Sequence, residues 1–307
     1  MTLEVFDSQR LSNAGQHDLS DALEEGKIVY FPVSPVELPA PEELVFFREE
    51  LPKLLKLKNI SYHPESGRVR GLDTDDPDIA DRVHRTLVSM SDHIGDFLSK
   101  VAPSLTPGWT VGTCSFRPMQ EKGRNLKPHA SNELVHIDAG AYGATNGDRI
   151  MRFFINVNPI EDRVWATKGD FSQLYSRFGE AANIKPTHAS KTYLQKRPWD
   201  HLRTGLLNGL ASAGLPEAKI LDSSPYDRAM RKFHNYMKDT PSFQEDRVGH
   251  EELRYSPFSA WLVFTDMVSH ASLSGQFAFV HTSIVRLGNC RKPELAPYNI
   301  LRQSVGL

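Results

Sequence analysis

His136 and Asp138 stand two residues apart in the segment "ELVHIDAG", and both side chains are able to ligate a metal ion. Two imidazoles and one carboxylate hold iron(II), manganese or zinc and leave positions open for substrate and oxygen. In a strand, residues i and i+2 project to the same face, so both side chains would point the same way while Ile137 packs behind them. The spacing therefore fits two ligands of one metal ion.

Spacing alone is weak evidence, because two other pairs of the same type occur. With 12 histidines and 38 acidic residues among 307, chance gives about 1.5 His-x-Asp/Glu pairs. The other two are His63/Glu65 in "SYHPESG", which is typical of a turn, and His250/Glu252 in the polar "RVGHEELR", which is typical of a loop or helix. Only His136 lies in an alternating segment that precedes a Gly-rich turn and a hydrophobic strand with which it would pair.

A third ligand is expected from a distant strand. His270 in "FTDMVSHASLSGQ" follows a predicted strand and turn and precedes another strand. The alternative is that His270 only caps that turn. His281, inside the last predicted strand, is a rival ligand, although a single histidine in a strand core is more often structural.

Hydrophobic periodicity predicts the elements that would position these residues. Period-two alternation favours strands, whereas the recurrence of apolar residues every three or four positions from Ile79 to Val101, behind an Asp-Pro start, favours a helix. A strand in "KIVYFPV" and a helix from Pro41, broken near Pro52, are also expected. The main predicted strands are "WTVGTCSFRP", "ELVHIDAG", "RIMRFFINVNP", "SAWLVFTD" and "FAFVHTSIVRL".

Bulk composition indicates an ordinary globular protein. Hydrophobic content is 39%, charged content is 24% and the formal net charge is −2, so nothing points to nucleic acid as a partner. Two cysteines are too few for a disulfide framework, and neither a signal peptide nor a long apolar stretch is visible. These features predict a cytoplasmic location.

Several segments together resemble the Kdo hydroxylase family, iron(II)- and 2-oxoglutarate-dependent dioxygenases that hydroxylate 3-deoxy-D-manno-oct-2-ulosonic acid (Kdo) at carbon 3 in the lipopolysaccharide inner core. The segments span most of the chain: "KNISYHPESGRVRGL", "TCSFRPMQEKGR", "VHIDAG", "GDRIMRFFINVNP", "RVWATKGDF" and "FTDMVSHASLSGQFAFVHTS".

The resemblance implies an α+β fold around a double-stranded β-helix of the jelly-roll or cupin-like type. It implies iron(II) held by His136, Asp138 and His270, with 2-oxoglutarate and O2 consumed and succinate and CO2 released. One dioxygenase domain over 1–307 would comprise a mainly helical part at 1–108, a β core at 109–167 and 255–287, and a helical insertion at 168–254.

Such an enzyme needs a cation for the distal carboxylate of 2-oxoglutarate, ideally the planar fork of an arginine. The stretch after His270 has no arginine before Arg286. In "RIMRFFINVNP", period two places Arg152 and Asn156 on one face and Arg149 on the other. Arg152 is the first candidate, with Asn156 beside it, and a structural salt bridge is the alternative. The reserves are Arg117, Arg163 and His281.

The expected substrate is Kdo-lipid A or a related anionic glycolipid, which requires basic residues near the mouth and suggests peripheral contact with the inner membrane. The runs "KLLKLKN", "EKGRNLK" and "RAMRKFHNYMK" are candidates for these residues. Two alternatives remain open: a 2-oxoglutarate oxygenase with another small-molecule or sugar-acid substrate, and a barrel protein that binds a sugar without oxygen chemistry.

Overall fold

The computed structural model describes residues 2–123, 126–128, 131–140, 143–185 and 223–306, together with Leu194, Trp199 and Leu206. The helices are α1 (Ser8–Asn13), α2 (Asp18–Glu24), α3 (Pro41–Glu49), η1 (Leu51–Leu54), α4 (Pro77–Val101), α5 (Phe171–Phe178), α7 (Pro225–Asp239), α8 (Pro241–Glu245), η4 (Leu287–Asn289), η5 (Pro293–Leu295) and α9 (Pro297–Ser304). The strands are β1 (Leu3–Val5), β2 (Ile28–Phe31), β3 (Ile60–His63), β4 (Arg68–Arg70), β5 (Thr110–Arg117), β6 (Arg149–Asn156), β7 (Arg163–Thr167), β8 (Glu251–Tyr255), β9 (Ala260–Phe264), β10 (Ala271–Ser274) and β11 (Ala278–Val285).

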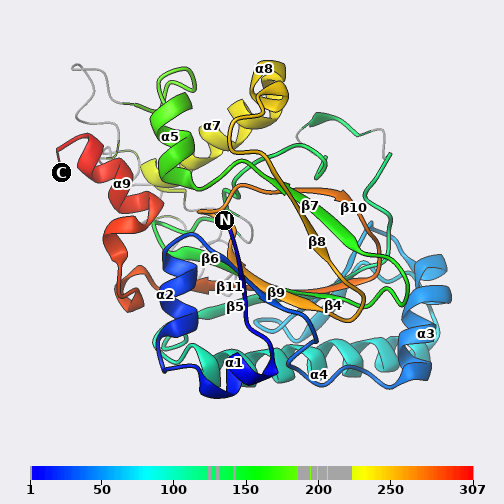
Figure 1. The fold of residues 1–307 in the computed structure, drawn as a ribbon. Coiled ribbons are helices and arrows are strands. Elements are labelled where there is room, and N and C mark those ends of the chain that lie inside the picture. The colour runs from blue at the N-terminus through cyan, green and yellow to red at the C-terminus, as the bar shows by residue number, and fades with distance from the viewer. Residues whose placement is uncertain are drawn as a thin grey trace.

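Two sheets stack as layers. Within the described residues, the large sheet has the order β1-β2-β9-β6-β11-β5-β3-β4, and the small sheet has the order β10-β7-β8. All neighbours pair antiparallel except β1 and β2. Figure 1 shows the small sheet above the large one and α4 beneath it, so the large sheet is covered on both faces.

The strand register assigns the side chains of the large sheet to these two faces. Arg152 of β6 is paired with Thr282 of β11, and Phe154 with Val280; directly paired residues share a face. Phe154 and Val280 belong to a cluster between the sheets that also contains Trp165, Tyr255 and Trp261. Arg152 therefore lies on the interior face, which is closed off by the small sheet.

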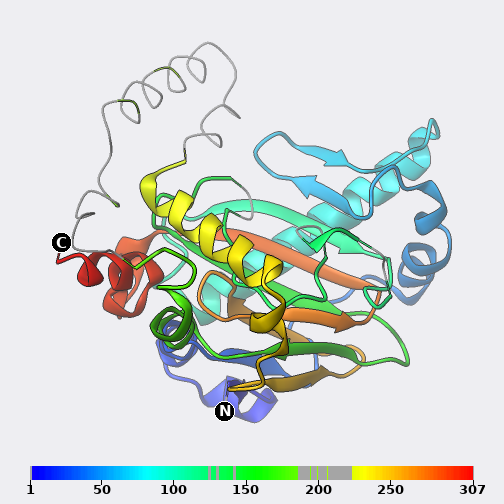
Figure 2. The same ribbon diagram turned by 90° about the horizontal axis from the view of Figure 1, so that it is seen from above.

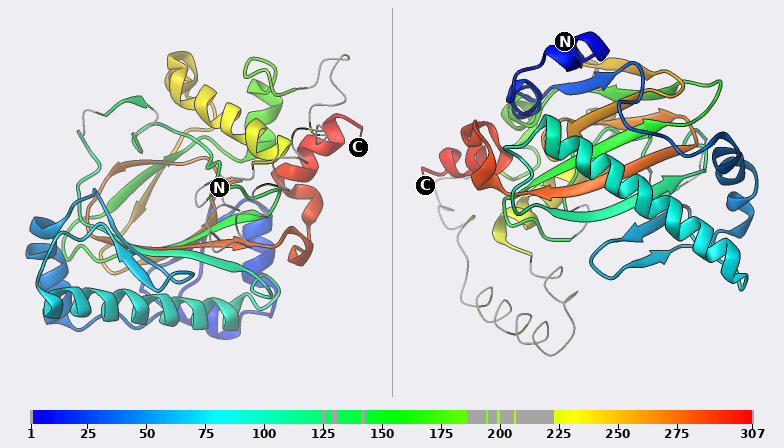
Figure 3. Two further views of the ribbon diagram at one scale, coloured as in Figure 1. Left: turned by 180° about the vertical axis from the view of Figure 1, so that it is seen from behind. Right: turned by 90° about the horizontal axis from the view of Figure 1, so that it is seen from below.

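The opposite face packs on α4. This helix starts where Asp76 accepts hydrogen bonds from the backbone N–H groups of Asp78 and Ile79, and Pro77 occupies its first turn. Its buried stripe includes Val83, Leu87, Met90, Ile94 and Leu98, which share one hydrophobic cluster with Phe153 and Phe279 of the sheet. Seen from below, α4 crosses the strands of the large sheet (Figure 3).

Helix α7, which belongs to the predicted insertion, covers the other side of the molecule. Ser224 and Asp227 form a reciprocal cap at the start of α7, and Asp227 also accepts hydrogen bonds from the backbone N–H groups of Thr145 and Asn146. Figure 2 shows α7 lying over the strands from above. This helix therefore holds in place the chain that follows Asp138.

Three expectations about the elements need correction. The predicted mainly helical part, 1–108, also contributes β1, β2, β3 and β4 at the two edges of the large sheet, of which only β2 was expected. The predicted helical insertion, 168–254, ends in strand β8, which contains Glu252, expected in a loop or helix; His250 lies in the loop just before the strand. The segment "ELVHIDAG" forms a single bridge instead of a strand. Much of the insertion, 186–222, lies outside the described residues apart from three single positions.

Candidate metal centre

The structure brings His136, Asp138 and His270 together between the two sheets. One ligand atom from each lies within 4.8 Å of the others, and all three side chains are buried. Nε2 of His136 is 3.7 Å from Oδ1 of Asp138, and Nε2 of His270 is 3.9 Å from Oδ2. These separations are too long for hydrogen bonds, but they suit three ligands that surround one ion.

Backbone pairing fixes the spacing of the two imidazoles. His136 and His270 form an isolated antiparallel bridge, in which the N–H of each donates to the carbonyl of the other, at 3.0 and 2.8 Å. The N–H of Asp138 instead donates to the carbonyl of Thr265, in the turn after β9. Because the chain changes its partner within two residues, it makes no regular strand here and does not pair with β6.

Hydrogen bonds to backbone carbonyls orient both rings. Nδ1 of His136 lies 2.7 Å from the carbonyl of Leu134, and Nδ1 of His270 lies 3.0 Å from that of Val268. A carbonyl accepts only from a protonated nitrogen, so Nε2 of each neutral ring presents its lone pair to the site. The Trp165 ring stacks on His270 at a centroid distance of 5.2 Å, which further fixes that ring.

The electrostatics favour the protonation states that bind a metal. Burial, with the neighbouring His270, lowers the pKa of His136 well below its ordinary value, and burial also lowers the pKa of His270. Burial alone would raise the pKa of Asp138, but Arg152, His270 and His136 together hold it far below its usual range. Two neutral imidazoles and one carboxylate are the charge states that ligands require.

The donor set fits an octahedral divalent ion such as iron(II). Oδ2 of Asp138 is buried without a hydrogen-bond partner, although Nη2 of Arg152 is 3.2 Å away. A buried carboxylate oxygen left in this state is costly unless it ligates a cation. Two histidines and one carboxylate on one side of an ion define the class of non-haem iron(II) oxygenase sites.

Three arginines reach the same interior space. Arg117 is paired in register with Ala278 of β11, and Arg152 with Thr282, on the face that carries Phe154. Arg163 begins β7 and shares a face with Trp165, which belongs to the cluster between the sheets. We call Arg117, Arg152 and Arg163 the arginine cluster.

The cluster has unused hydrogen-bond donors. Nε of each of the three guanidinium groups, and Nη1 of Arg163, are buried with no partner among the described residues. Burial and the neighbouring Arg152 and Arg163 lower the pKa of Arg117 to about 9. Mutually repelling cations with free N–H groups form a site that a bound anion would stabilise.

Two expected cosubstrate residues do not contribute to this space. The side-chain amide of Asn156 donates to the carbonyls of Glu161, Tyr255 and Ser256, so it is used in holding a loop. His281 is paired in register with Phe153 and Cys114, and its ring lies 6.0 Å from that of Trp109 on the α4 side of the sheet. The alternation of β11 therefore turns His281 away from the metal centre.

Two residues of α7 lie beside the centre; sequence reasoning included both in the basic run "RAMRKFHNYMK" but singled out neither. The His234 ring is 5.0 Å from the His136 ring, and Nδ1 of His234 lies 2.8 Å from the carbonyl of Ile137. Lys238, one turn further on, is 5% exposed; burial lowers the pKa of its ammonium, and Asp138 partly offsets that effect. The signal was present in the sequence, since His234 and Lys238 directly follow Phe233 and Met237, two apolar residues one helical turn apart.

The comparisons with known proteins concern the chain as a whole. The family model described as 3-deoxy-D-manno-oct-2-ulosonic acid (Kdo) hydroxylase matches residues 7–307, whereas no curated protein matched. Solved structures of the Kdo hydroxylase KdoO, described as a non-heme Fe(II) alpha-ketoglutarate-dependent dioxygenase, are similar with a TM-score of 0.79 at 23% identity and cover 100% of this chain. They include the apo form, a complex with alpha-ketoglutarate and Fe(III), and one with succinate and Fe(III), of which 97%, 96% and 97% of each chain are covered.

The site thus has the residue types, two histidines and one carboxylate, by which non-haem iron(II) oxygenases hold their metal. More narrowly, the chain belongs to the Kdo hydroxylase family.

Proposed function

We propose that this chain is an iron(II)- and 2-oxoglutarate-dependent dioxygenase that hydroxylates Kdo at carbon 3 in Kdo-lipid A. The observation that carries the proposal is the convergence of His136, Asp138 and His270 beside the arginine cluster, within a chain that matches the Kdo hydroxylase family over 7–307.

Within this proposal, the two layers form a double-stranded β-helix. The central order of the large sheet, β9-β6-β11-β5, faces β8, β7 and β10, and the His136 bridge extends the small layer by one short segment. Such a barrel keeps its interior for ligands and its outer faces for helices, as α4 and α7 indicate. The whole chain would then act as one dioxygenase domain.

The side chains at the centre would have different roles. His136, Asp138 and His270 would hold iron(II), which supplies oxygen activation coupled to decarboxylation of 2-oxoglutarate when it is bound. The arginine cluster would receive the distal carboxylate, since Nε of Arg117 has no hydrogen-bond partner among the described residues and Arg152 adjoins Asp138. Trp165 and the surrounding apolar cluster exclude water from the reacting atoms.

Basic residues at the mouth support an anionic sugar as substrate. Lys238 of α7 lies close enough to Asp138 and to Lys58 for both to affect the pKa of its ammonium. These lysines come from two of the three basic runs of the sequence, whereas part of the third, "EKGRNLK", lies outside the described residues. A Kdo carboxylate or a lipid A phosphate would be attracted to this pair.

The proposed enzyme activity is tested by measuring iron-dependent succinate formation with Kdo-lipid A as substrate. We expect His136→Ala to abolish it, and the control His250→Ala, from a His-x-Glu pair outside the site, to retain it. Mass analysis of the product should show one added oxygen on Kdo. Succinate formation that requires another sugar acid would favour the first alternative substrate class, and sugar binding without succinate would favour a binding protein.

Peripheral membrane contact is a separate part of the proposal. The described residues contain no helix long and apolar enough to cross a bilayer. Leu57 is 61% exposed between Lys56 and Lys58, a combination that suits the surface of an acidic membrane. Co-sedimentation with acidic liposomes that Leu57→Glu reduces would support this contact, and indifference to acidic liposomes would contradict it.

A further inference from the structure

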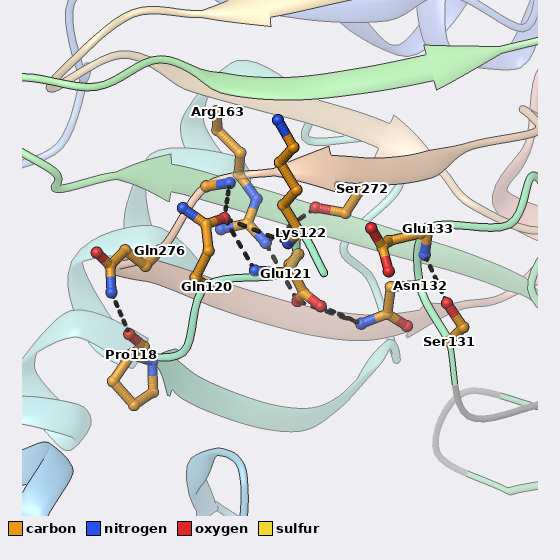
Figure 4. Close-up of polar contacts among 11 residues, drawn as sticks. Pro118, Gln120, Glu121, Lys122, Ser131, Asn132, Glu133, Arg163, Ser272 and Gln276 are labelled. Atoms are coloured by element: carbon orange, nitrogen blue, oxygen red, sulfur yellow. Dashed lines mark hydrogen bonds and ion pairs between the residues drawn. The ribbon is translucent and has the colours of Figure 1, made fainter. Parts of the chain in front are cut away.

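Glu121 lies at the end of the barrel interior, on the loop that follows β5. Its side chain is buried, with 4% of the residue exposed. Oε1 lies 3.4 Å from Nη2 of Arg163, and both carboxylate oxygens are 3.2 Å from Nδ2 of Asn132 (Figure 4). The side chain of Glu121 is therefore held in a defined position at the site, because a cation and an amide compensate for the desolvation of its carboxylate.

Arg163 is fixed from several directions. Its Nη2 also donates to Oγ of Ser272, at 3.1 Å. Gly275 packs against its stem so closely that an added Cβ would lie 2.7 Å from Cγ of Arg163. The contacts with Glu121 and Ser272 use Nη2 only, so Nε and Nη1 remain buried without partners. The guanidinium is thus held by one end, with its other donors available to an anion.

The same carboxylate lies where the two segments that contain His136 and His270 meet. Asn132 precedes His136 by four residues, and its carbonyl accepts a hydrogen bond of 2.7 Å from the N–H of Ser272, two residues after His270. The backbone of Glu121 is itself tied to the turn after β10, since its N–H donates to the carbonyl of Gly275 at 3.3 Å. Glu121 therefore links the loop after β5, the His136 segment and strand β10 at one point (Figure 4).

We propose that Glu121 is a positioning residue, which holds the guanidinium of Arg163 so that its free N–H groups face the distal carboxylate of 2-oxoglutarate. The inference rests on the proposed cosubstrate role of the arginine cluster. Glu121 does not touch the cosubstrate itself; it acts through Arg163. Without its charge, Arg163 would be a buried cation beside Arg117 and Arg152 with no ion-pair partner in the described part of the chain, and repulsion would turn it away from the bound orientation.

The test measures 2-oxoglutarate binding to zinc-loaded protein by titration calorimetry, because zinc has no redox chemistry and turnover is excluded. Glu121→Gln keeps the shape and an oxygen for Asn132 but removes the charge. We expect it to weaken the Kd about tenfold, the scale of one charge-assisted hydrogen bond. In the iron-loaded enzyme, KM for 2-oxoglutarate should rise while kcat is largely retained.

A double-mutant cycle separates positioning from a general charge effect. If Glu121 acts through Arg163, adding Glu121→Gln to Arg163→Gln should change the Kd by no more than about twofold. The matched control is Glu133→Gln, because Glu133 lies on the same loop and accepts a hydrogen bond from the N–H of Gly123 without contacting Arg163. Its Kd should stay within about twofold of wild type.

Several results would overturn the inference: a Glu121→Gln Kd that is unchanged or tighter, or a loss that is fully additive with Arg163→Gln. If Glu121→Gln fails to fold, Asn132→Ala provides the second variant, and it should weaken the Kd in the same direction by a smaller factor. An unchanged Kd there would also overturn the inference. Failure of the wild-type protein to bind 2-oxoglutarate would instead overturn the proposed function itself, and this inference with it.

Discussion

The pairs Asp266–Arg149 and Asp138–Arg152 join the same residue types on opposite faces of the large sheet. Nε of Arg149 lies 2.6 Å from Oδ2 of Asp266, each side chain is 1% exposed, and Oδ1 of Asp266 accepts a hydrogen bond from the N–H of Ile150. Arg152 and Asp138 are 3.2 Å apart and 14% and 11% exposed, and Oδ2 of Asp138 has no hydrogen-bond partner.

The difference separates a structural ion pair from a binding site. On the helix-side face, both carboxylate oxygens of Asp266 have protein partners. On the interior face, Asp138 faces two imidazole nitrogens at distances too long for hydrogen bonds, and its Oδ2 has no hydrogen-bond partner. The arginines do not differ in this respect, since Nη1 of Arg149 and Nε of Arg152 are both buried without a partner. A buried carboxylate with an unsatisfied oxygen, more than the presence of charge, marks the functional face.

The largest expected effect comes from the interior carboxylate. Asp138→Asn should weaken metal binding by about a hundredfold or more, because an amide lacks the charge of the ligand that it replaces. Competition with a chelator measures the affinity, and Asp266→Asn is the control on the other face. Similar metal affinity in Asp138→Asn and wild type would contradict the comparison.

Of the two arginines, the one on the helix-side face should contribute more to the stability of the fold. Arg149→Gln should lower the free energy of unfolding by about 3 to 5 kcal/mol, because it leaves the Asp266 charge buried and unpaired. Metal affinity should not change. Denaturant unfolding gives the value, and Arg152→Gln is the counterpart: it should cost less stability and should weaken 2-oxoglutarate binding. Equal stability losses would remove the distinction between the two pairs.

The interior face should also respond to pH. Arg117 is cationic below its pKa of about 9 and neutral above it; the groups around it are Arg152, Arg163, Glu121 and Asp138. Affinity for the 2-oxoglutarate dianion should therefore be full below this pKa and fall as the pH rises through it. Calorimetric titrations with 2-oxoglutarate, at pH values below and above this pKa, measure the change in Kd. Arg117→Gln should bind more weakly but lose this decline, and an unaltered decline would exclude Arg117 as its source.

The smallest effect is expected from the histidine on the helix side. His281→Gln should leave metal and 2-oxoglutarate affinity within about twofold of wild type and change the free energy of unfolding by about 1 kcal/mol. Burial lowers the pKa of His281 to about 4, so the neutral ring already behaves as an uncharged side chain at physiological pH. Loss of metal binding in this variant would place His281 at the centre.

Much of the centre was predictable because it depends on local alternation. Period two correctly separated Arg152 from Arg149, and the i, i+2 spacing of His136 and Asp138 places both at the centre, although their segment is not a strand. Local patterns do not encode contacts between distant segments. The pairing of His136 with His270, the burial of Glu121 against Arg163 and the approach of His234 all depend on the tertiary fold. The face of His281 follows from strand register, which fixes direction more strictly than residue type does.

The reciprocal bridge between His136 and His270 sets the distance between the two imidazoles through a direct contact of two segments that are far apart in the sequence. Helix α7 lies between them in the sequence and carries Lys238, which takes no part in this bridge. We therefore expect side-chain changes on the exposed face of α7 to leave the spacing of the imidazoles as it is. The part of the chain that would select a substrate and the part that would hold the metal can then vary separately.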